Sequence, residues 1–315
     1  MNHLRFISRV ACVVALTIFG ASFANAQTTM TIVNDSFDDD DRTVTGMSGT
    51  DIEIPLFGTS GTNAIQDGTG TDTIGLVTGT SGRQLHGIFQ TQTLAMAGDS
   101  ITSYITFTTP ATVQNLGSDD IRIGLFSDGG NTAALSNDLS ASTNTPELLL
   151  NGLSGYAIEL DVDPATVTNQ DVNIRRSDPS TTGRLLGTNT GISNFSSSAD
   201  NGYVFTPNTT YSLHTTILRN AANELDITAE FFQGTTLIDS VNDVDSNPLG
   251  FDFGLFGIGA STNAFGSTNS FDTPADNGIE LENITIEFTT TVPEPGSAML
   301  LLSGLGALGF VRRRK

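Results

Sequence analysis

Three carboxylates at alternate positions are the residues of this sequence whose types and spacing could do chemistry together. The segment Glu159-Leu160-Asp161-Val162-Asp163 places an acid at every second position. In a β-strand these acids would lie on one face about 6.6 Å apart, because successive side chains point to opposite faces. Two carboxyl groups at short range can cleave a glycosidic bond when one donates a proton and the other attacks the sugar.

The same segment resembles the Glu-x-Asp-x-x-Glu motif of laminarinase-type glycoside hydrolases. The resemblance implies a jelly-roll fold in which Glu159 is the nucleophile and Asp161 its helper. Asp163 stands where that family has its final Glu, Pro164 follows it, and the chain has no Trp to stack on a sugar. We therefore predict that the protein has no catalytic residues and is not an enzyme. On this interpretation the three acids form a solvated polar face, and glycan hydrolysis is the alternative.

A second acidic group stands near the start of the chain. Asp38–Asp41 are four consecutive acids, and Asp35 precedes them. Carboxylate oxygens are the ligands that Ca²⁺ prefers. If the first and last strands of the domain pair, Glu280 or Glu282 lies close by. Two interpretations are open, a solvated loop or a calcium site, and the candidate calcium ligands are Asp35, Asp38, Asp39, Asp40, Asp41 and Glu282.

The sequence lacks the other common catalytic and metal motifs. His86 and His214 are the histidines of the central body, and neither has a partner at a metal-ligand spacing. There is no Gly-x-Ser-x-Gly nucleophile elbow. We predict no zinc site, no Ser-His-Asp triad and no cofactor other than calcium, and we interpret both histidines as ordinary sheet residues.

Strands must position these residues, because apolar and polar residues alternate through much of residues 27–291. Alternation with a period of two predicts strands with one buried face. In the segment of the three acids, Tyr156, Ile158 and Leu160 share the opposite face. The segments that alternate in the same way are 101–107, 121–125, 211–217 and 225–231. We predict one all-β domain over residues 27–291, in which about 12 to 14 short strands form a two-sheet antiparallel sandwich.

The alternation changes phase near the end of this domain. Ile279 and Leu281 fall on one face, whereas Ile284 and Ile286 fall on the other. This shift predicts a β-bulge at Glu282-Asn283. The opening segment 31–37 and the closing segment 279–288 are similar to the first and last strands of concanavalin A-like jelly rolls. That similarity implies a jelly-roll sandwich and carries no catalytic motif.

The residues after the domain have a different composition. Val292-Pro293-Glu294-Pro295 precedes an apolar stretch over 298–311, and Arg312-Arg313-Arg314-Lys315 follows it. A helix over that stretch covers roughly 21 Å, less than a hydrocarbon core of about 30 Å. The cations at its end orient such a helix with the body outside the cytoplasm. We predict a short transmembrane helix.

This tail resembles the PEP-CTERM sorting signal of Gram-negative bacteria, with Pro293, Glu294 and Pro295 as the sorting and cleavage motif. The resemblance covers residues 292–315. It implies that an exosortase, a membrane transpeptidase-like protease, cuts near the motif. It also implies anchoring in the inner membrane before the cut, and then delivery to the cell surface or extracellular matrix. Bacteria that use this signal typically make extracellular polysaccharide.

The first 26 residues have the three parts of a secretory signal peptide. Arg5 and Arg9 precede an apolar run over 10–23, and Ala24-Asn25-Ala26 supplies the small residues of a cleavage site. We predict that signal peptidase cuts before Gln27 and removes the single cysteine, Cys12. A retained N-terminal membrane helix is the alternative.

The charge balance limits the partners. The whole chain carries a net charge of −21, and residues 27–291 hold 33 acidic and 7 basic side chains, a balance of −26. Such a surface repels phosphate backbones, so we predict no nucleic-acid partner. We predict an exported, non-enzymatic surface or matrix protein that meets signal peptidase, an exosortase and, transiently, the inner membrane. The alternatives are a carbohydrate-binding or adhesive module that binds extracellular polysaccharide, with or without calcium, and a glycoside hydrolase.

Overall fold

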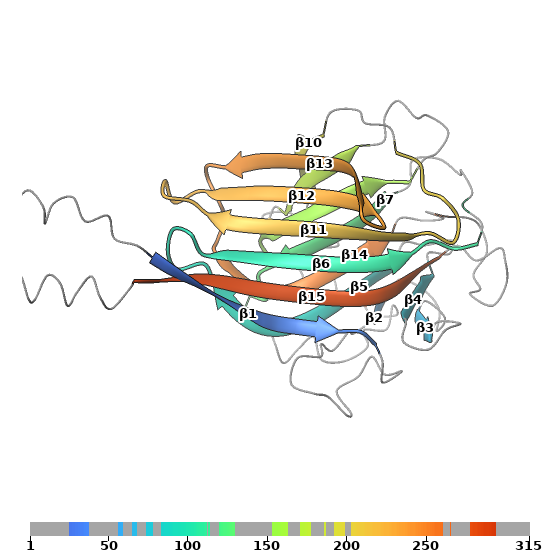
Figure 1. Cartoon of the computed structure of the whole chain (residues 1–315), viewed down its shortest axis with the longest axis horizontal. Helices are drawn as coiled ribbons and strands as arrows, with labels where there is room; N and C mark the ends of the chain where they lie inside the picture. The colour runs from blue at the N-terminus through green and yellow to red at the C-terminus, as the bar shows by residue number, and fades with distance from the viewer. Residues whose placement is uncertain are drawn as a thin grey trace, which may run out of the picture. The chain divides into compact units, whose positions relative to one another are not determined.

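A computed structural model describes fourteen stretches of the chain. These are residues 25–37, 56–58, 65–67, 74–77, 83–111, 113, 120–129, 153–162, 171–177, 186, 192–198, 203–260, 265 and 278–293. Every regular element among them is a β-strand (Figure 1). The chain divides into two units. One is Thr29–Thr289, and the other combines Met1–Thr28 with Thr290–Lys315.

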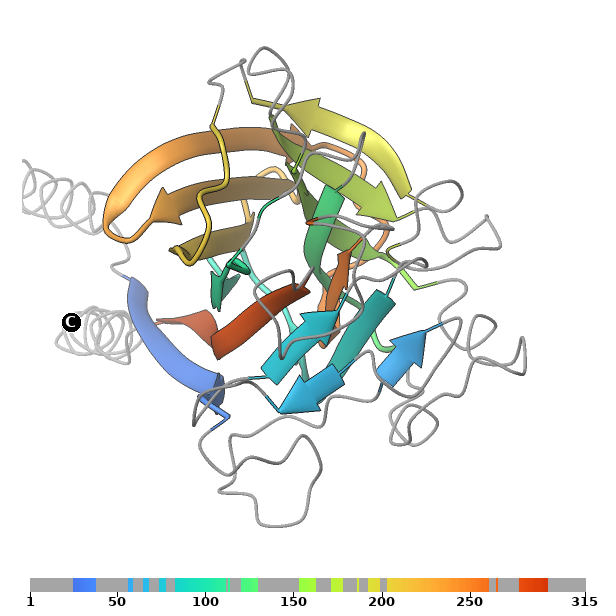
Figure 2. The same cartoon turned by 90° about the vertical axis from the view of Figure 1, so that its right-hand side faces the viewer.

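Two antiparallel sheets form the larger unit, as the alternation predicted, and the prediction of an all-β sandwich is confirmed (Figures 1 and 2). Sheet A has the order β13(Thr236–Asp245), β12(Leu225–Gln233), β11(Thr210–Arg219), β6(Ser100–Thr108), β15(Gly278–Pro293), β4(Ile74–Val77) and β3(Ile65–Asp67), and β1(Asn25–Asp35) also pairs with β15. Sheet B has the order β10(Ile192–Ser197), β9(Val172–Ser177), β8(Gly155–Asp161), β7(Asp120–Phe126), β14(Asp252–Ala260), β5(Arg83–Thr93) and β2(Leu56–Gly58).

The main core lies between the two sheets and is built from the apolar positions that alternate in the sequence. On β6, Ile101, Ser103, Ile105 and Phe107 are buried while the residues that alternate with them are partly exposed. Tyr156 and Ile158 of β8 contribute to the same core from sheet B. Each fully buried side chain of this size stabilises the fold by about 1.5–3 kcal/mol relative to exposure. The period of two therefore determines which face of each strand turns inward.

The outer face of sheet B is also buried, which the alternation did not predict. Phe126, Ala157 and Leu255 of three neighbouring strands pack there with Leu153 and Leu186 in a second apolar cluster. The described residues of β7 and β8 are consequently buried on both faces at most positions. A side chain that points away from the main core at this place still lies inside the protein.

The first and last strands pair, and the predicted bulge is present. The register of β15 against β6 shifts between Leu281 and Asn283, so Glu282 is the extra residue. The side-chain amide of Asn283 donates to the backbone oxygen of Asp35 over 3.2 Å, which ties the end of β1 to the bulge. The predicted bulge is confirmed, and the pairing of the first and last strands, which the sequence analysis set as a condition, is present.

Polar contacts from strand β13 connect the two sheets at one edge of the sandwich. Asp245 is 2% exposed and accepts a hydrogen bond of 2.6 Å from the hydroxyl of Tyr156, on β8. Arg176 of β9 donates to the same carboxylate over 3.1 Å. Asp239 accepts a hydrogen bond of 2.7 Å from the hydroxyl of Ser198. Two acids of one edge strand thereby bind partners from the opposite sheet.

Candidate functional site

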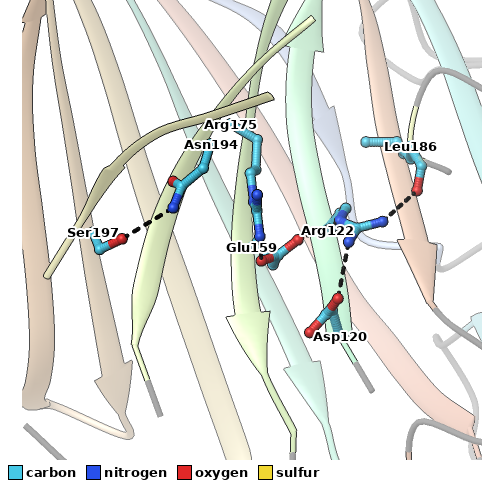
Figure 3. A network of polar contacts seen from close by, with 7 residues as sticks. All are labelled: Asp120, Arg122, Glu159, Arg175, Leu186, Asn194 and Ser197. Carbon is cyan, nitrogen blue, oxygen red and sulfur yellow. Dashed lines mark hydrogen bonds and ion pairs between the residues drawn. The ribbon is translucent and has the colours of Figure 1, made fainter. Parts of the chain in front are cut away.

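Glu159 lies at the centre of a buried ionic cluster on the outer face of sheet B. It is 3% exposed, and it sits on β8 between Arg122 of β7 and Arg175 of β9 (Figure 3). Arg122 donates through Nε to Glu159 Oε2 over 2.6 Å, and Arg175 donates through Nη2 to Glu159 Oε1. Both carboxylate oxygens therefore accept a charge-assisted hydrogen bond. The prediction of a solvated polar face is wrong for Glu159, because the second apolar cluster covers this side of the sheet.

Arg122 joins three other groups into the cluster. Besides Glu159, its guanidinium donates to the carboxylate of Asp120 over 2.8 Å and to the backbone oxygen of Leu186 over 3.2 Å (Figure 3). The residue sits between Ile121 and Ile123, so strand alternation turns its side chain away from the main core. A guanidinium group has donors enough for all three acceptors.

Two titrating groups on this face have perturbed acidity. Burial and then the charge of Glu159 raise the pKa of Asp120 to about 7, although the nearby Arg122 opposes the change. Asp120 lies directly opposite Asp161 in the β7–β8 register, and that second acid also raises its pKa. Burial lowers the pKa of His86 to about 3, so His86 is neutral in mild acid. A Cβ at Gly257 would contact both His86 and Leu186, which shows how closely this face is covered.

The three catalytic candidates, Glu159, Asp161 and Asp163, differ in their surroundings. Glu159 has both oxygens bound to guanidinium groups, whereas a glycosidase nucleophile needs a free oxygen facing the sugar. Asp161 is partly exposed at the end of β8. Asp163 lies outside the described residues. Sequence reasoning missed Arg122 and Arg175, and the signal that could have found Arg122 is its alternation with Ile121 and Ile123.

The calcium candidates divide between described and undescribed residues. Asp35 is buried and accepts the backbone N–H of Phe37 over 2.9 Å. Glu282 accepts hydrogen bonds from the hydroxyls of Thr108 and Thr210. Asp38–Asp41 lie outside the described residues. Within the stretches that the structure describes, no three His, Cys, Asp or Glu side chains are grouped so as to hold a metal ion.

A row of rings crosses the outer face of sheet A. The rings of Tyr104 on β6 and His214 on β11 have centroids 4.9 Å apart, and those of His214 and Phe232 on β12 are 4.6 Å apart. All three side chains are partly exposed. Glu230 lies directly opposite His214 in the β11–β12 register. Both histidines thus lie in strands, as predicted from the sequence.

The processing residues lie at the ends of the described chain. Ala26 is exposed on β1, and β15 ends at Pro293. The other residues named for processing lie outside the described part of the structure, and they are Ala24, Glu294, Pro295, Arg312, Arg313, Arg314 and Lys315. No helix among the described residues is long and apolar enough to cross a membrane. The predicted helix over 298–311 is not among them.

Comparison with known proteins assigns the tail. Residues 291–315 match the model described as the PEP-CTERM protein-sorting motif, which confirms the resemblance seen in the sequence. A chain with this motif is exported and sorted to the surface by an exosortase in Gram-negative bacteria. No curated protein matches the chain.

Several solved structures are similar to the sandwich. The basic winged bean lectin with Tn-antigen is 10% identical, covers 84% of this chain and 99% of its own, and has a TM-score of 0.42. The Ca²⁺/Man-bound exoplasmic/lumenal domain of VIP36 is 11% identical, with coverages of 80% and 88% and a TM-score of 0.44. The marine PL-14 alginate lyase from Aplysia kurodai is 12% identical, with coverages of 82% and 98% and a TM-score of 0.49. At these identities the likeness concerns the fold alone.

Proposed function

We propose that this protein is a non-enzymatic component of the cell surface or extracellular matrix, and that its β-sandwich is the part delivered there. The observation that carries the proposal is the sorting motif at residues 291–315, which begins within the last strand of the sandwich. Cleavage near Pro293, Glu294 and Pro295 would therefore release the folded domain with all of its strands. The acidic balance of residues 27–291 suits a soluble exterior protein.

The Glu159 cluster supports a structural role for the one set of acids that resembles a catalytic motif. Its carboxylate is buried between Arg122 and Arg175, and the second apolar cluster lies on the same face. A soluble-glucan assay tests this part of the proposal. We expect no turnover above background from the purified protein. Turnover that disappears in Glu159→Gln would make the hydrolase interpretation correct instead.

Sorting is tested by expressing the full chain in a Gram-negative host with and without an exosortase. With the enzyme, we expect a shorter form at the cell surface or in the medium, and a mass that ends near Pro293. Without it, the form that keeps residues 292–315 should stay in the inner membrane. Deletion of residues 292–315 is the matched control and should give an exported form that is neither anchored nor cut. An uncut chain in the cytosol of the competent host would contradict the proposal.

Binding of extracellular polysaccharide is a second candidate function, favoured by the ring row of Tyr104, His214 and Phe232. Aromatic rings on a sheet surface offer apolar faces to the C–H groups of sugars, and carboxylates such as Glu230 accept hydrogen bonds from hydroxyls. A pull-down on matrix polysaccharide, with and without a chelator, tests it. Binding should fall at least about tenfold in Tyr104→Ala/Phe232→Ala. It should not change in Met30→Ala, which removes an exposed apolar side chain from β1.

A further inference from the structure

The two predicted processing sites lie on paired strands. Strand β1 begins at Asn25, beside the predicted signal peptidase site, and β15 ends at Pro293, inside the sorting motif. The two strands pair with each other. In Figure 1 they lie side by side and run in opposite directions, so the start of β1 is next to the end of β15.

Side-chain contacts locate this pairing at two points, which are one residue out of step with each other. The hydroxyls of Thr29 and Thr289 are 2.8 Å apart, and Thr285 donates to the side-chain oxygen of Asn34 over 3.3 Å. From the first contact to the second, the residue numbers rise along β1 and fall along β15, as in antiparallel strands. Both contacts place residues 25–28 of β1 alongside residues 290–293 of β15, to within one residue.

For the last residues of β15, strand β1 is the neighbour that matters. The pairing of β15 with β6 ends at Thr289 and Ser100. Strand β4 pairs with residues 278–281 of β15, so among the described strands β1 is the one placed to pair with residues 290–293. Residues 26–31 of β1 are exposed, and Val292 is 42% exposed. Thr291 is buried at this end, but the exposed side chains around it contribute little, so the pairing depends largely on backbone hydrogen bonds.

A protease binds its substrate as an extended backbone that is free to pair with the enzyme, in the manner of an added strand. We propose that Asn25 and Ala26 pair with Val292 and Pro293 in the precursor, and that signal peptidase must remove them before the exosortase can cut. The inference rests on the sorting function proposed above. Hydrolysis adds water across the Ala26–Gln27 amide, leaving a carboxylate on Ala26 and an amine on Gln27. Gln27 and Thr28 still pair with β15 afterwards, so the domain stays closed while the sorting motif becomes accessible.

The first test retains the leader. Ala26→Phe removes the small residue that signal peptidase needs, and the full chain is followed by pulse–chase in a host with an exosortase, with both termini determined by mass. We expect the leader to remain and the sorting cut to slow roughly 5- to 30-fold. This is the effect of retaining one or two hydrogen bonds between the leader and β15. A leader-bearing chain that is cut at the unmodified rate would overturn the proposal.

A second variant separates pairing from simple tethering by the leader. Gln27→Pro/Thr28→Pro is combined with Ala26→Phe. Because backbone N–H groups alternate in direction along a strand, two consecutive prolines remove at least one ladder bond to β15. We expect the sorting cut to recover although the leader is still attached. If the cut stays slow, tethering explains the delay and the proposal is wrong. If the unmodified chain loses its leader and is never cut, the sorting function itself has failed.

Discussion

Glu159 is buried with its charge because two guanidinium groups lie against it, and a second acid, Asp120, shares one of them. Removing two charges from water costs several kcal/mol, and their attraction offsets this cost only when the remaining lone pairs and protons are also bonded. Arg122 meets that condition, since it donates to Glu159, Asp120 and Leu186. The cluster is therefore expected to lose more stability from the removal of one member than a surface ion pair would.

Replacement of Glu159 tests this expectation. In Glu159→Gln the amide keeps one acceptor but presents N–H groups to a guanidinium, so Arg175 loses its carboxylate partner and the buried Arg122 keeps only Asp120. We expect the free energy of unfolding, measured by urea denaturation, to fall by about 3 kcal/mol. Asp252→Asn is the control, because Asp252 is exposed and its amide can still accept from Thr93. The control should change stability by less than about 0.5 kcal/mol, and an equally small effect of Glu159→Gln would contradict the assignment.

The pH dependence of stability depends on two opposed groups. Asp120 has its folded pKa raised from 3.8 to about 7, so the folded state binds its proton more tightly, and its contribution is lost as pH rises through that window. His86 has its folded pKa lowered from 6.5 to about 3, so its contribution is present above pH 6.5 and is lost as pH falls toward 3. Between about pH 4 and 6.5 the two trends partly cancel.

Asp120→Asn should separate the two trends. The variant loses the group whose stability contribution falls with pH, while its amide oxygen still accepts from Arg122. We expect its free energy of unfolding to rise by about 2 kcal/mol from pH 4 to 6.5. At pH 8 it should be more stable than the unmodified protein, because position 120 then carries no charged carboxylate. Urea unfolding at each pH measures this, and a curve parallel to that of the unmodified protein would show that Asp120 titrates normally.

The acids of this cluster could be located from the sequence, but their partners could not. The spacing of Glu159 and Asp161 identifies a shared strand face. Arg122 and Arg175 are 37 and 16 positions from Glu159, and only the order of β7, β8 and β9 in the sheet brings them together. The burial of Glu159 depends in addition on the apolar cluster around Leu186. Leu186 lies outside β8, so the residue alternation of β8 does not indicate this cover.

At the scale of the elements, β13 is an edge strand of sheet A whose polar side chains bind the other sheet. Asp245 accepts from Tyr156 and Arg176, and Asp239 accepts from Ser198 and from the backbone N–H of Val172. These contacts satisfy acids that would otherwise be buried without partners, which is costly. They also fix how the two sheets meet at this edge, because hydrogen bonds are directional whereas apolar contacts are not.

Tyr156→Phe removes one of these links while it keeps the ring in the core. Asp245 then loses its shortest hydrogen bond, and we expect a loss of about 1–3 kcal/mol in the free energy of unfolding. Tyr104→Phe is the matched control, because that hydroxyl is on the outer face of sheet A, and its effect should stay below about 0.5 kcal/mol. Equal effects of the two changes would mean that the contact between Tyr156 and Asp245 does not hold the sheets together.

The strands and the bulge could be predicted because both follow from the local alternation of apolar and polar residues. The phase change between Leu281 and Ile284 needs only the sequence of β15. The links from Asp239 and Asp245 could not be predicted, because acids on an edge strand normally indicate solvent exposure. Their inward direction follows from the alternation of β13, where Val241 lies on the same buried face.

At the scale of the whole molecule, repulsion among the acidic side chains is the main electrostatic effect on stability. The arginines whose side chains the structure describes are all engaged in ion pairs or hydrogen bonds, and they are Arg122, Arg175, Arg176 and Arg219. Residues 27–291 keep a balance of −26, so dilute buffer leaves a strong self-repulsion that salt screens within a Debye length of about 8–10 Å. Added NaCl should raise the melting temperature until screening is complete.

Specific binding of Ca²⁺ is distinguished from general charge screening by comparing the melting temperatures in CaCl₂ and in NaCl at equal ionic strength. If Asp35 and Asp38–Asp41 bind Ca²⁺ with the affinity of extracellular modules, about 10⁻⁴–10⁻³ M, then 10 mM CaCl₂ adds about 1.4–2.7 kcal/mol. That corresponds to a rise of roughly 3–10 °C in melting temperature beyond the NaCl control. Replacing the four acids 38–41 by Asn should abolish this excess and leave the response to NaCl, since most of the charge balance remains. Equal melting temperatures in the two salts, together with no heat of binding in a calorimetric titration, would show that these acids form a solvated loop.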